Sequence, residues 1–170
     1  GTSKIYSVVG NSPAENAGLR AGDVIEKLKA DNGNQVIIDS IETLNTFFSE
    51  NSNCKVLNVV VDRKGEKKEF NISKKEYVAS YVKYFDAETS VNVVTNGSKS
   101  STQEYILEES YNLPSDTALI TLQSFMGDAD VQLGYALEYM QQRGKSKLIL
   151  DLRDNGGGQV EVLCKIANYL

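Results

Sequence analysis

A chain of 170 residues is long enough for one ordinary domain, or for one small domain and part of another. Its hydrophobic content of 41% and charged content of 24% are typical of a globular protein and exclude a disordered one. We expect no membrane span, because no apolar run approaches the roughly 18 residues that such a helix needs. The net charge of −5 comes without a concentrated Lys/Arg face, which argues against nucleic acid as a partner.

The sequence contains no histidine and only two cysteines. Ser-His-Asp and Cys-His catalysis within this chain are therefore excluded, as are zinc sites built from histidine or from four cysteines. Cys54 and Cys164 lie in apolar segments, and we predict that both are buried free thiols. We expect no metal and no cofactor.

The first 75 residues predict a small domain of strands and short helices. Strands are expected over residues 4–9, 24–28, 55–62 and 68–72. Ser12 is expected to cap a short helix, with Pro13 at its first position and Gly18 at its end. Asp39, followed three residues later by Glu42, predicts the start of a second helix.

Residues 12–25, with the sequence SPAENAGLRAGDVI, resemble a PDZ domain of the type found in bacterial secreted and periplasmic proteases. The pattern has a physical basis, because small side chains can pack a tight helix on a sheet while glycines take the turns. The resemblance implies that residues 1–75 form a PDZ-like small β-barrel or sandwich with two helices. Such a domain binds the C-terminus of a polypeptide as an added strand.

The second predicted helix has one apolar face, formed by Ile41, Leu44, Phe47 and Phe48 at helical spacing. The resemblance makes Ile41, Leu44 and Phe48 the candidate wall of the peptide groove, although the same residues could serve simply as core. The strand and loop that receive the peptide carboxylate would precede Ile5. Only a few residues lie there, so the peptide-binding edge is expected to be absent or cut off.

Residues 76–117 are expected to form a connector that contains strands. The alternation over residues 77–85 predicts one strand, residues 91–94 another, and residues 95–102 a polar loop. Residues 105–111 fit no single pattern. The tyrosines of this connector favour packing of one domain on another over ligand binding.

From residue 118 the pattern changes to strand, helix, strand, helix. A strand is expected over residues 118–124, and Asp128 and Asp130 are expected to open a helix that Gly144 ends. The apolar run over residues 148–152 is typical of a parallel strand covered on both faces. The last helix, over residues 160–170, shows an apolar stripe: Val160, Leu163, Cys164 and Ala167.

A right-handed crossover would place these two strands in parallel. Two parallel strands do not make a stable sheet alone. We therefore expect the chain to be a fragment of a longer protein, or a second copy in a homo-oligomer to complete the sheet.

Three consecutive glycines, Gly156, Gly157 and Gly158, follow the second of these strands. Their spacing fits neither a dinucleotide fingerprint nor a P-loop, and the neighbouring Asp and Asn residues match no calcium loop. A structural turn would explain one glycine but explains three poorly. The remaining interpretation is an oxyanion hole, in which backbone N–H groups hold the negative oxygen of a tetrahedral intermediate.

Residues 117–125 (TALITLQSF) and 147–158 (KLILDLRDNGGG) resemble the catalytic domain of C-terminal processing (tail-specific) proteases, the serine peptidase family S41. The family pattern is close to LDLR, Asp or Asn, then NPGG, so Gly156 takes the place of the proline. The resemblance implies an α/β peptidase domain of the ClpP/crotonase-like type, of which residues 118–170 would be the first part. It implies Gly157 N–H as the oxyanion donor, Gly156 and Gly158 as shaping residues, and Asp151, Arg153 and Asn155 as structural support.

The resemblance also implies a serine nucleophile and a lysine general base, both expected beyond Leu170. A lysine can act as the base if burial lowers its pKa. The parent protein would then cleave exported polypeptides. It would work outside the cytoplasm, in the periplasm or cell envelope. This chain by itself would be inactive. Two alternatives stay open: a non-catalytic PDZ interaction protein, and a ligand carrier on the same fold.

Overall fold

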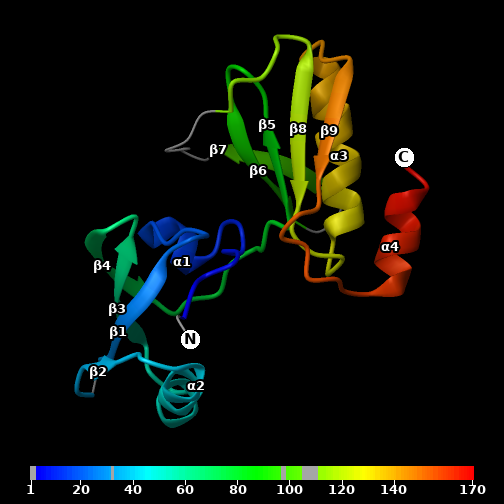
Figure 1. Ribbon diagram of the computed structural model, residues 1–170. Helices are drawn as coiled ribbons and strands as arrows, with labels where there is room; N and C mark the ends of the chain where they lie inside the picture. The colour runs from blue at the N-terminus through cyan, green and yellow to red at the C-terminus, as the bar shows by residue number, and fades with distance from the viewer. Residues whose placement is uncertain (1–2, 32, 97–98, 105–110) are drawn as a thin grey trace. The chain divides into compact units, whose positions relative to one another are not determined.

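A computed structural model describes residues 3–31, 33–96, 99–104 and 111–170 (Figure 1). The chain divides into two compact units, the first comprising Gly1–Val8 and Ser12–Tyr77 and the second Val9–Asn11 and Val78–Leu170. Within the described ranges there are two sheets and four helices, so the expected mixture of α and β structure is confirmed.

The first unit contains a four-stranded antiparallel sheet in the order β2-β1-β3-β4. Its strands are β1 (Val24–Ala30), β2 (Val36–Ile37), β3 (Val56–Arg63) and β4 (Glu66–Ser73), and its helices are α1 (Pro13–Ala17) and α2 (Ile41–Glu50). The predicted caps of α1 are confirmed: Ser12 Oγ accepts a hydrogen bond from the N–H of Glu15, and Gly18 adopts a φ of 101°. The β3–β4 turn at Lys64 and Gly65 is also confirmed, with φ positive at both residues.

Two predictions for the first unit need correction. Residues 4–9 do not form a regular strand, because only Lys4 makes an isolated bridge, to Val24. Helix α2 is capped by Ser40 and not by Asp39; Ser40 Oγ accepts a hydrogen bond from the N–H of Thr43 at 3.0 Å. Asp39 instead accepts one from the Thr43 hydroxyl. Adjacent Asp and Ser residues are equally good caps, and backbone geometry decided between them.

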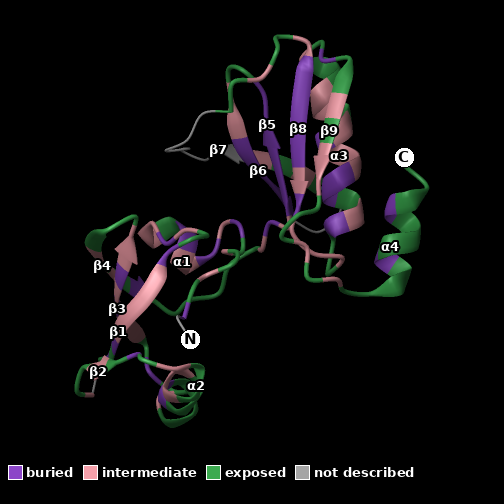
Figure 2. Cartoon of the chain, viewed as in Figure 1, coloured by how far each residue is buried: buried purple, intermediate pink, exposed green. Residues whose placement is uncertain are grey.

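The second unit contains a five-stranded mixed sheet in the order β7-β6-β5-β8-β9. Its strands are β5 (Val82–Phe85), β6 (Ser90–Asn96), β7 (Lys99–Glu104), β8 (Thr117–Leu122) and β9 (Lys147–Asp151), and its helices are α3 (Ala129–Gln142) and α4 (Val160–Ala167). β8 and β9 are parallel, as predicted, and the other pairs are antiparallel. The buried side chains of β5, β6 and β8 pack with those of α3 in one core. Figure 2 shows buried residues, in purple, on β5, β8 and α3.

The predictions for the connector, residues 76–117, were the least accurate. The described residues of the predicted polar loop, 95–96 and 99–102, belong to the paired strands β6 and β7, with Val94 opposite Ser101. The predicted strand over residues 77–85 is regular only from Val82. Most of the ambiguous segment 105–111 lies outside the described residues. The parallel pair therefore does not stand alone, because three antiparallel strands of the same chain extend it.

Helix α4, the last helix of the chain, packs through a different face from the predicted apolar stripe. Val162 and Ile166 are its buried residues, whereas Val160, Leu163 and Cys164 are exposed. The reason is tertiary: α4 lies against α3. Strand β9 is not covered on both faces either, because Ile149 is 47% exposed. Of the two cysteines only Cys54 is buried, so the prediction for Cys164 was wrong; both thiols are free.

Candidate functional site

The glycine loop follows β9 and is attached to the residues that follow β8. The two strands are parallel, so their carboxyl ends lie side by side. Phe125 N–H donates to the carbonyl oxygen of Gly157 at 3.0 Å, and Gln159 N–H donates to the carbonyl oxygen of Phe125 at 2.8 Å. Together these bonds make a short parallel bridge between Phe125 and Gly158. The loop is therefore held at the edge where α/β proteins commonly place their sites.

Asn155 holds the loop from inside. Its Nδ2 donates to the carbonyl oxygen of Leu122 at 3.0 Å, and its Oδ1 accepts from the N–H of Gly157 at 2.8 Å. Asn155 thus links the end of β8 to the middle of the glycine loop. The same bond engages the N–H of Gly157, the donor that the sequence favoured. In this arrangement that N–H is not available to a bound oxyanion.

The three glycines meet different requirements. Gly158 has a φ of 147°, and a Cβ placed there would lie only 2.4 Å from the carbonyl oxygen of Phe125. Gly157 has a φ of 101° but has open space around it. Gly156 has neither a positive φ nor a close neighbour. Only Gly157 and Gly158 therefore need glycine for backbone reasons, and a side chain is accommodated at Gly156.

Asp151 and Arg153 form a two-bond ion pair at the end of β9. Arg153 Nε donates to Oδ1 of Asp151 at 2.9 Å and Nη2 donates to Oδ2 at 2.7 Å. The Arg153 hydrogen bonds are the main cause that lowers the pKa of Asp151 below its ordinary value, against a smaller opposing effect of burial. The guanidinium itself is largely in solvent, with 77% of the side chain exposed.

Sequence reasoning missed one residue of this site, Ser124. Its hydroxyl donates to the carbonyl oxygen of Gly157 at 3.0 Å, beside the bond from Phe125 N–H. Ser124 lies in the TALITLQSF segment, but no spacing rule distinguishes it from other serines that follow strands. Only the fold brings it to the glycine loop, 33 residues away in sequence.

The predicted groove wall in the first unit is partly exposed. Ile41 and Phe48 of α2 are 65% and 44% exposed, and Leu44 is half-buried. Phe47, by contrast, lies in the core of the unit. The helix therefore divides its apolar residues between core and surface.

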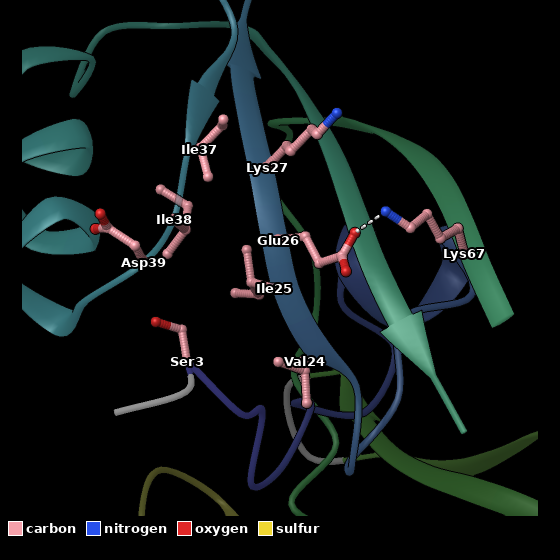
Figure 3. A pocket seen from close by; sticks show the side chains of 9 residues that line it. All are labelled: Ser3, Val24, Ile25, Glu26, Lys27, Ile37, Ile38, Asp39 and Lys67. Carbon is pink, nitrogen blue, oxygen red and sulfur yellow. Dashed lines mark ion pairs between the residues drawn. The ribbon is translucent and has the colours of Figure 1, made fainter. Parts of the chain in front are cut away.

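A hollow of about 370 Å³ lies elsewhere in the same unit, beside β1 and β2 (Figure 3). Its lining residues are Ser3, Val24, Ile25, Glu26, Lys27, Ile37, Ile38, Asp39 and Lys67. Glu26 and Lys67, which both line it, form an ion pair with 3.0 Å between Oε2 and Nζ. None of the three predicted groove-wall residues lines this hollow.

The described ranges contain no group of three or more His, Cys, Asp or Glu side chains that could hold a metal ion. Within the same ranges, no helix combines the length and the apolar composition needed to cross a membrane.

The C-terminal part of the second unit is similar to a known peptidase family. Residues 116–170 match the model of peptidase family S41, and this segment contains β8, α3, β9, the glycine loop and α4. The resemblance to S41 C-terminal processing proteases is thereby confirmed.

The particular relatives are bacterial serine proteases. The chain is 26% identical over 164 residues to a probable CtpA-like serine protease of Staphylococcus aureus strain N315, and 24% identical to its counterpart in strain COL. Each alignment covers 96% of this chain and 27% of the relative, so the chain spans about a quarter of the length of these curated relatives. Among solved structures, the photosystem II D1 C-terminal processing protease aligns with 99% of this chain and 44% of its own, with 15% identity and a TM-score of 0.47.

Proposed function

We propose that this chain is part of a Ser-Lys peptidase of the S41 type that cleaves polypeptides near their C-termini. The glycine loop would hold the oxygen of the tetrahedral intermediate. The serine nucleophile and the lysine base would come from parts of the protease that follow Leu170. Proteases of this family usually work outside the cytoplasm, and we extend that location to the parent protein.

One observation carries the proposal. Within the segment that matches the S41 model, the glycine loop lies at the carboxyl ends of two parallel strands and is fixed there by backbone bonds to Phe125. Backbone N–H groups held in this way need no reorganisation when negative charge develops, which is the requirement of an oxyanion hole.

The first unit would bind the substrate as a PDZ domain. The order of α1, β1, β2, α2 and β3 supports this role, as do the exposed Ile41 and Phe48 on α2. The test is binding of an apolar peptide with a free C-terminus against the same peptide amidated. Replacing Phe48→Ala should weaken binding of the free peptide. Val131→Ala, which removes an exposed apolar side chain of α3, is the matched control.

The test of the whole proposal compares the full-length protein with the 170-residue chain on an unstructured polypeptide. The full-length protein should cleave it and the chain alone should not. Cleavage by the chain alone would place the nucleophile within residues 1–170 and refute our assignment. A full-length protein that binds free C-termini without cleaving them would be an interaction protein; the engaged Gly157 N–H is the observation that favours this second candidate.

A further inference from the structure

The glycine loop contains an Asn–Gly pair where the S41 pattern has Asn–Pro. Residues 155–158 read NGGG in this chain and NPGG in the family pattern. Proline has no N–H, so its nitrogen cannot attack a neighbouring side chain. Glycine keeps the N–H and has no Cβ to hinder an approach. The replacement at Gly156 therefore puts a nitrogen that is a nucleophile once deprotonated directly after the side-chain amide of Asn155.

The Asn155 side chain is folded back over this nitrogen. Its Oδ1 accepts from the N–H of Gly157 at 2.8 Å, which closes an Asx-type turn. Because that turn spans Gly156, it holds Cγ of Asn155 close to the Gly156 nitrogen. Gly156 is exposed, and no acceptor for its N–H is found among the described residues. The two reacting atoms are thus neighbours, and water has access to the proton on the nitrogen.

We propose that Asn155 is a site of spontaneous deamidation in the folded protein, and that the reaction unfastens the glycine loop from β8. Water or hydroxide takes the proton of Gly156 N–H, and the nitrogen forms a bond to Cγ of Asn155. The Cγ–Nδ2 bond breaks, and Nδ2 leaves as ammonia with a proton from water. Water then opens the five-membered imide ring at one of its two carbonyls and leaves aspartate or isoaspartate. In total one water is consumed and one ammonia is released, without oxidation or reduction.

The two hydrogen bonds of Asn155 act in opposite directions on this reaction. Gly157 N–H stabilises the negative charge that develops on Oδ1 as the ring closes. The carbonyl oxygen of Leu122, 3.0 Å from Nδ2, holds the nitrogen that must leave. One hydrogen bond of this kind slows a step about tenfold at most. The rate in the folded protein should therefore stay within about tenfold of the rate in the unfolded chain.

Either product removes the link between the loop and β8. A carboxylate at position 155 has no proton to donate, so two acceptors would face each other where Nδ2 now meets the Leu122 oxygen. Isoaspartate also lengthens the backbone before Gly156. The remaining ties of the loop are its bonds with Phe125 and Ser124, and we expect them to open more often. The inference rests on the proposed peptidase function only in its last step, in which the full-length protein loses activity with age.

The first measurement follows the mass of tryptic peptide 154–165 from the full-length protein during incubation at mildly alkaline pH. Its one asparagine is Asn155, and the peptide should gain the mass that separates an acid from an amide. The same incubation in urea gives the rate for the unfolded chain. Asn71, which precedes the branched Ile72 in peptide 69–74, is the control in the same digest and should keep its amide. Conversion more than about tenfold slower than in urea, or equal conversion at Asn71, would overturn the proposal.

Two variants test the role of the Gly156 nitrogen. Gly156→Pro removes the N–H and restores the residue of the family pattern, so the amide of Asn155 should persist. Gly156→Ala keeps the N–H but adds a Cβ, and its conversion rate should lie between those of the wild type and Gly156→Pro. Gly156 has no positive φ and has space for a side chain, so both variants are expected to fold, which circular dichroism checks. Conversion of Asn155 in Gly156→Pro at the wild-type rate would exclude attack by this nitrogen and overturn the mechanism.

The last measurement separates the chemistry from the proposed function. Hydrogen exchange at the N–H groups of Phe125 and Gln159, which fasten the loop, should rise about tenfold after conversion and in Asn155→Asp. Cleavage by aged wild type should fall in step with the mass change, whereas Gly156→Pro should keep its own initial rate. Conversion without faster exchange would overturn the release of the loop. Conversion in a full-length protein that never cleaves would refute the proposed function and leave the deamidation site standing.

Discussion

Two ends of the second unit's sheet each carry an arginine–aspartate pair, but in opposite settings. Where β5 ends, Arg143 Nε lies 2.6 Å from Oδ2 of Asp86; the Asp86 side chain is fully buried and that of Arg143 is 25% exposed. Where β9 ends, Arg153 lies 2.7 Å from Asp151 and is 77% exposed. The nitrogen–oxygen distances of the two pairs are nearly equal, so the pairs differ mainly in their exposure to solvent. Burial makes loss of a partner costly at the first end, whereas water compensates for it at the second.

The buried carboxylate of Asp86 is well satisfied. Besides Arg143, it accepts hydrogen bonds from the hydroxyl of Tyr84 at 2.9 Å and from the N–H groups of Glu88 and Thr89. Burial alone would raise the pKa of Asp86, but the bonds from Arg143, Glu88, Tyr84 and Thr89 together hold it well below its ordinary value. This end of the sheet is therefore fixed by charge, and the end with the glycine loop by backbone bonds.

The largest effect is expected from Arg143→Ala. It leaves the carboxylate of Asp86 buried with incomplete compensation, and breaking a buried pair in this way costs about 3–5 kcal/mol of unfolding free energy. Urea unfolding of the chain, followed by circular dichroism, measures it. Arg143→Lys keeps the charge but loses the two-bond geometry. Its free energy of unfolding should lie between those of Arg143→Ala and the wild type. A loss in Arg143→Ala below about 1 kcal/mol would contradict the comparison.

Gly158→Ala should have the next largest effect, at the opposite end of the sheet. Its Cβ would meet the Phe125 carbonyl oxygen at 2.4 Å in a backbone conformation that alanine rarely adopts. Strain of this kind costs about 1–3 kcal/mol, and the loop is expected to move away from Phe125 to relieve it. Cleavage by the full-length protein should fall with it.

Gly156→Ala is the matched control for Gly158→Ala, because it adds the same methyl group in the same loop where nothing lies within 4 Å. It should leave both stability and cleavage close to wild type. Equal losses in the two variants would mean that the loop needs glycine for flexibility and not for the approach to Phe125.

Acid should reduce the stability that the Asp86 end contributes. A carboxyl with a lowered folded-state pKa contributes stability that is complete above its unfolded pKa of about 4 and is lost as the pH falls toward the folded value. Urea unfolding from about pH 7 to about pH 3 should therefore show falling stability below about pH 4. Asp86→Asn, which cannot titrate, should flatten this slope. An identical slope in the variant would assign the acid sensitivity to other carboxyls.

Sequence patterns predicted the parts of the fold that local chemistry determines. Ser12, Gly18 and Gly144 marked helix ends correctly, and the apolar periodicity found β8, α3 and β9. The β6–β7 hairpin was missed because β7 has the sequence KSSTQE, which offers no alternation of apolar and polar residues. The buried face of α4 was missed because contact with α3 selects it, and no periodicity records which neighbour a helix will meet.

At the site, sequence predicted the loop but not its hydrogen bonds. Three adjacent glycines indicated exposed amides, yet their availability depends on where the Asn155 side chain lies and on the Ser124 hydroxyl. Asn155 lies only two residues from Gly157, whereas Ser124 reaches the loop through tertiary structure, from 33 residues away in sequence. The family resemblance pointed to Gly157, but it could not show that the N–H of Gly157 donates to Asn155. Asp151, Arg153 and Asn155 were predicted as supporting residues because they adjoin the loop in sequence, and that role stays a prediction.

The smallest effect is expected from Arg153→Ala, the counterpart of Arg143→Ala at the exposed end. Water replaces the guanidinium around Asp151, so the urea midpoint should stay within experimental error of the wild type. Salt sharpens the test: raising the ionic strength screens the exposed pair and leaves the buried one nearly unaffected. A loss in Arg153→Ala comparable to that in Arg143→Ala would show that the glycine loop depends on this pair. The backbone bonds to Phe125 would then be insufficient to hold the loop.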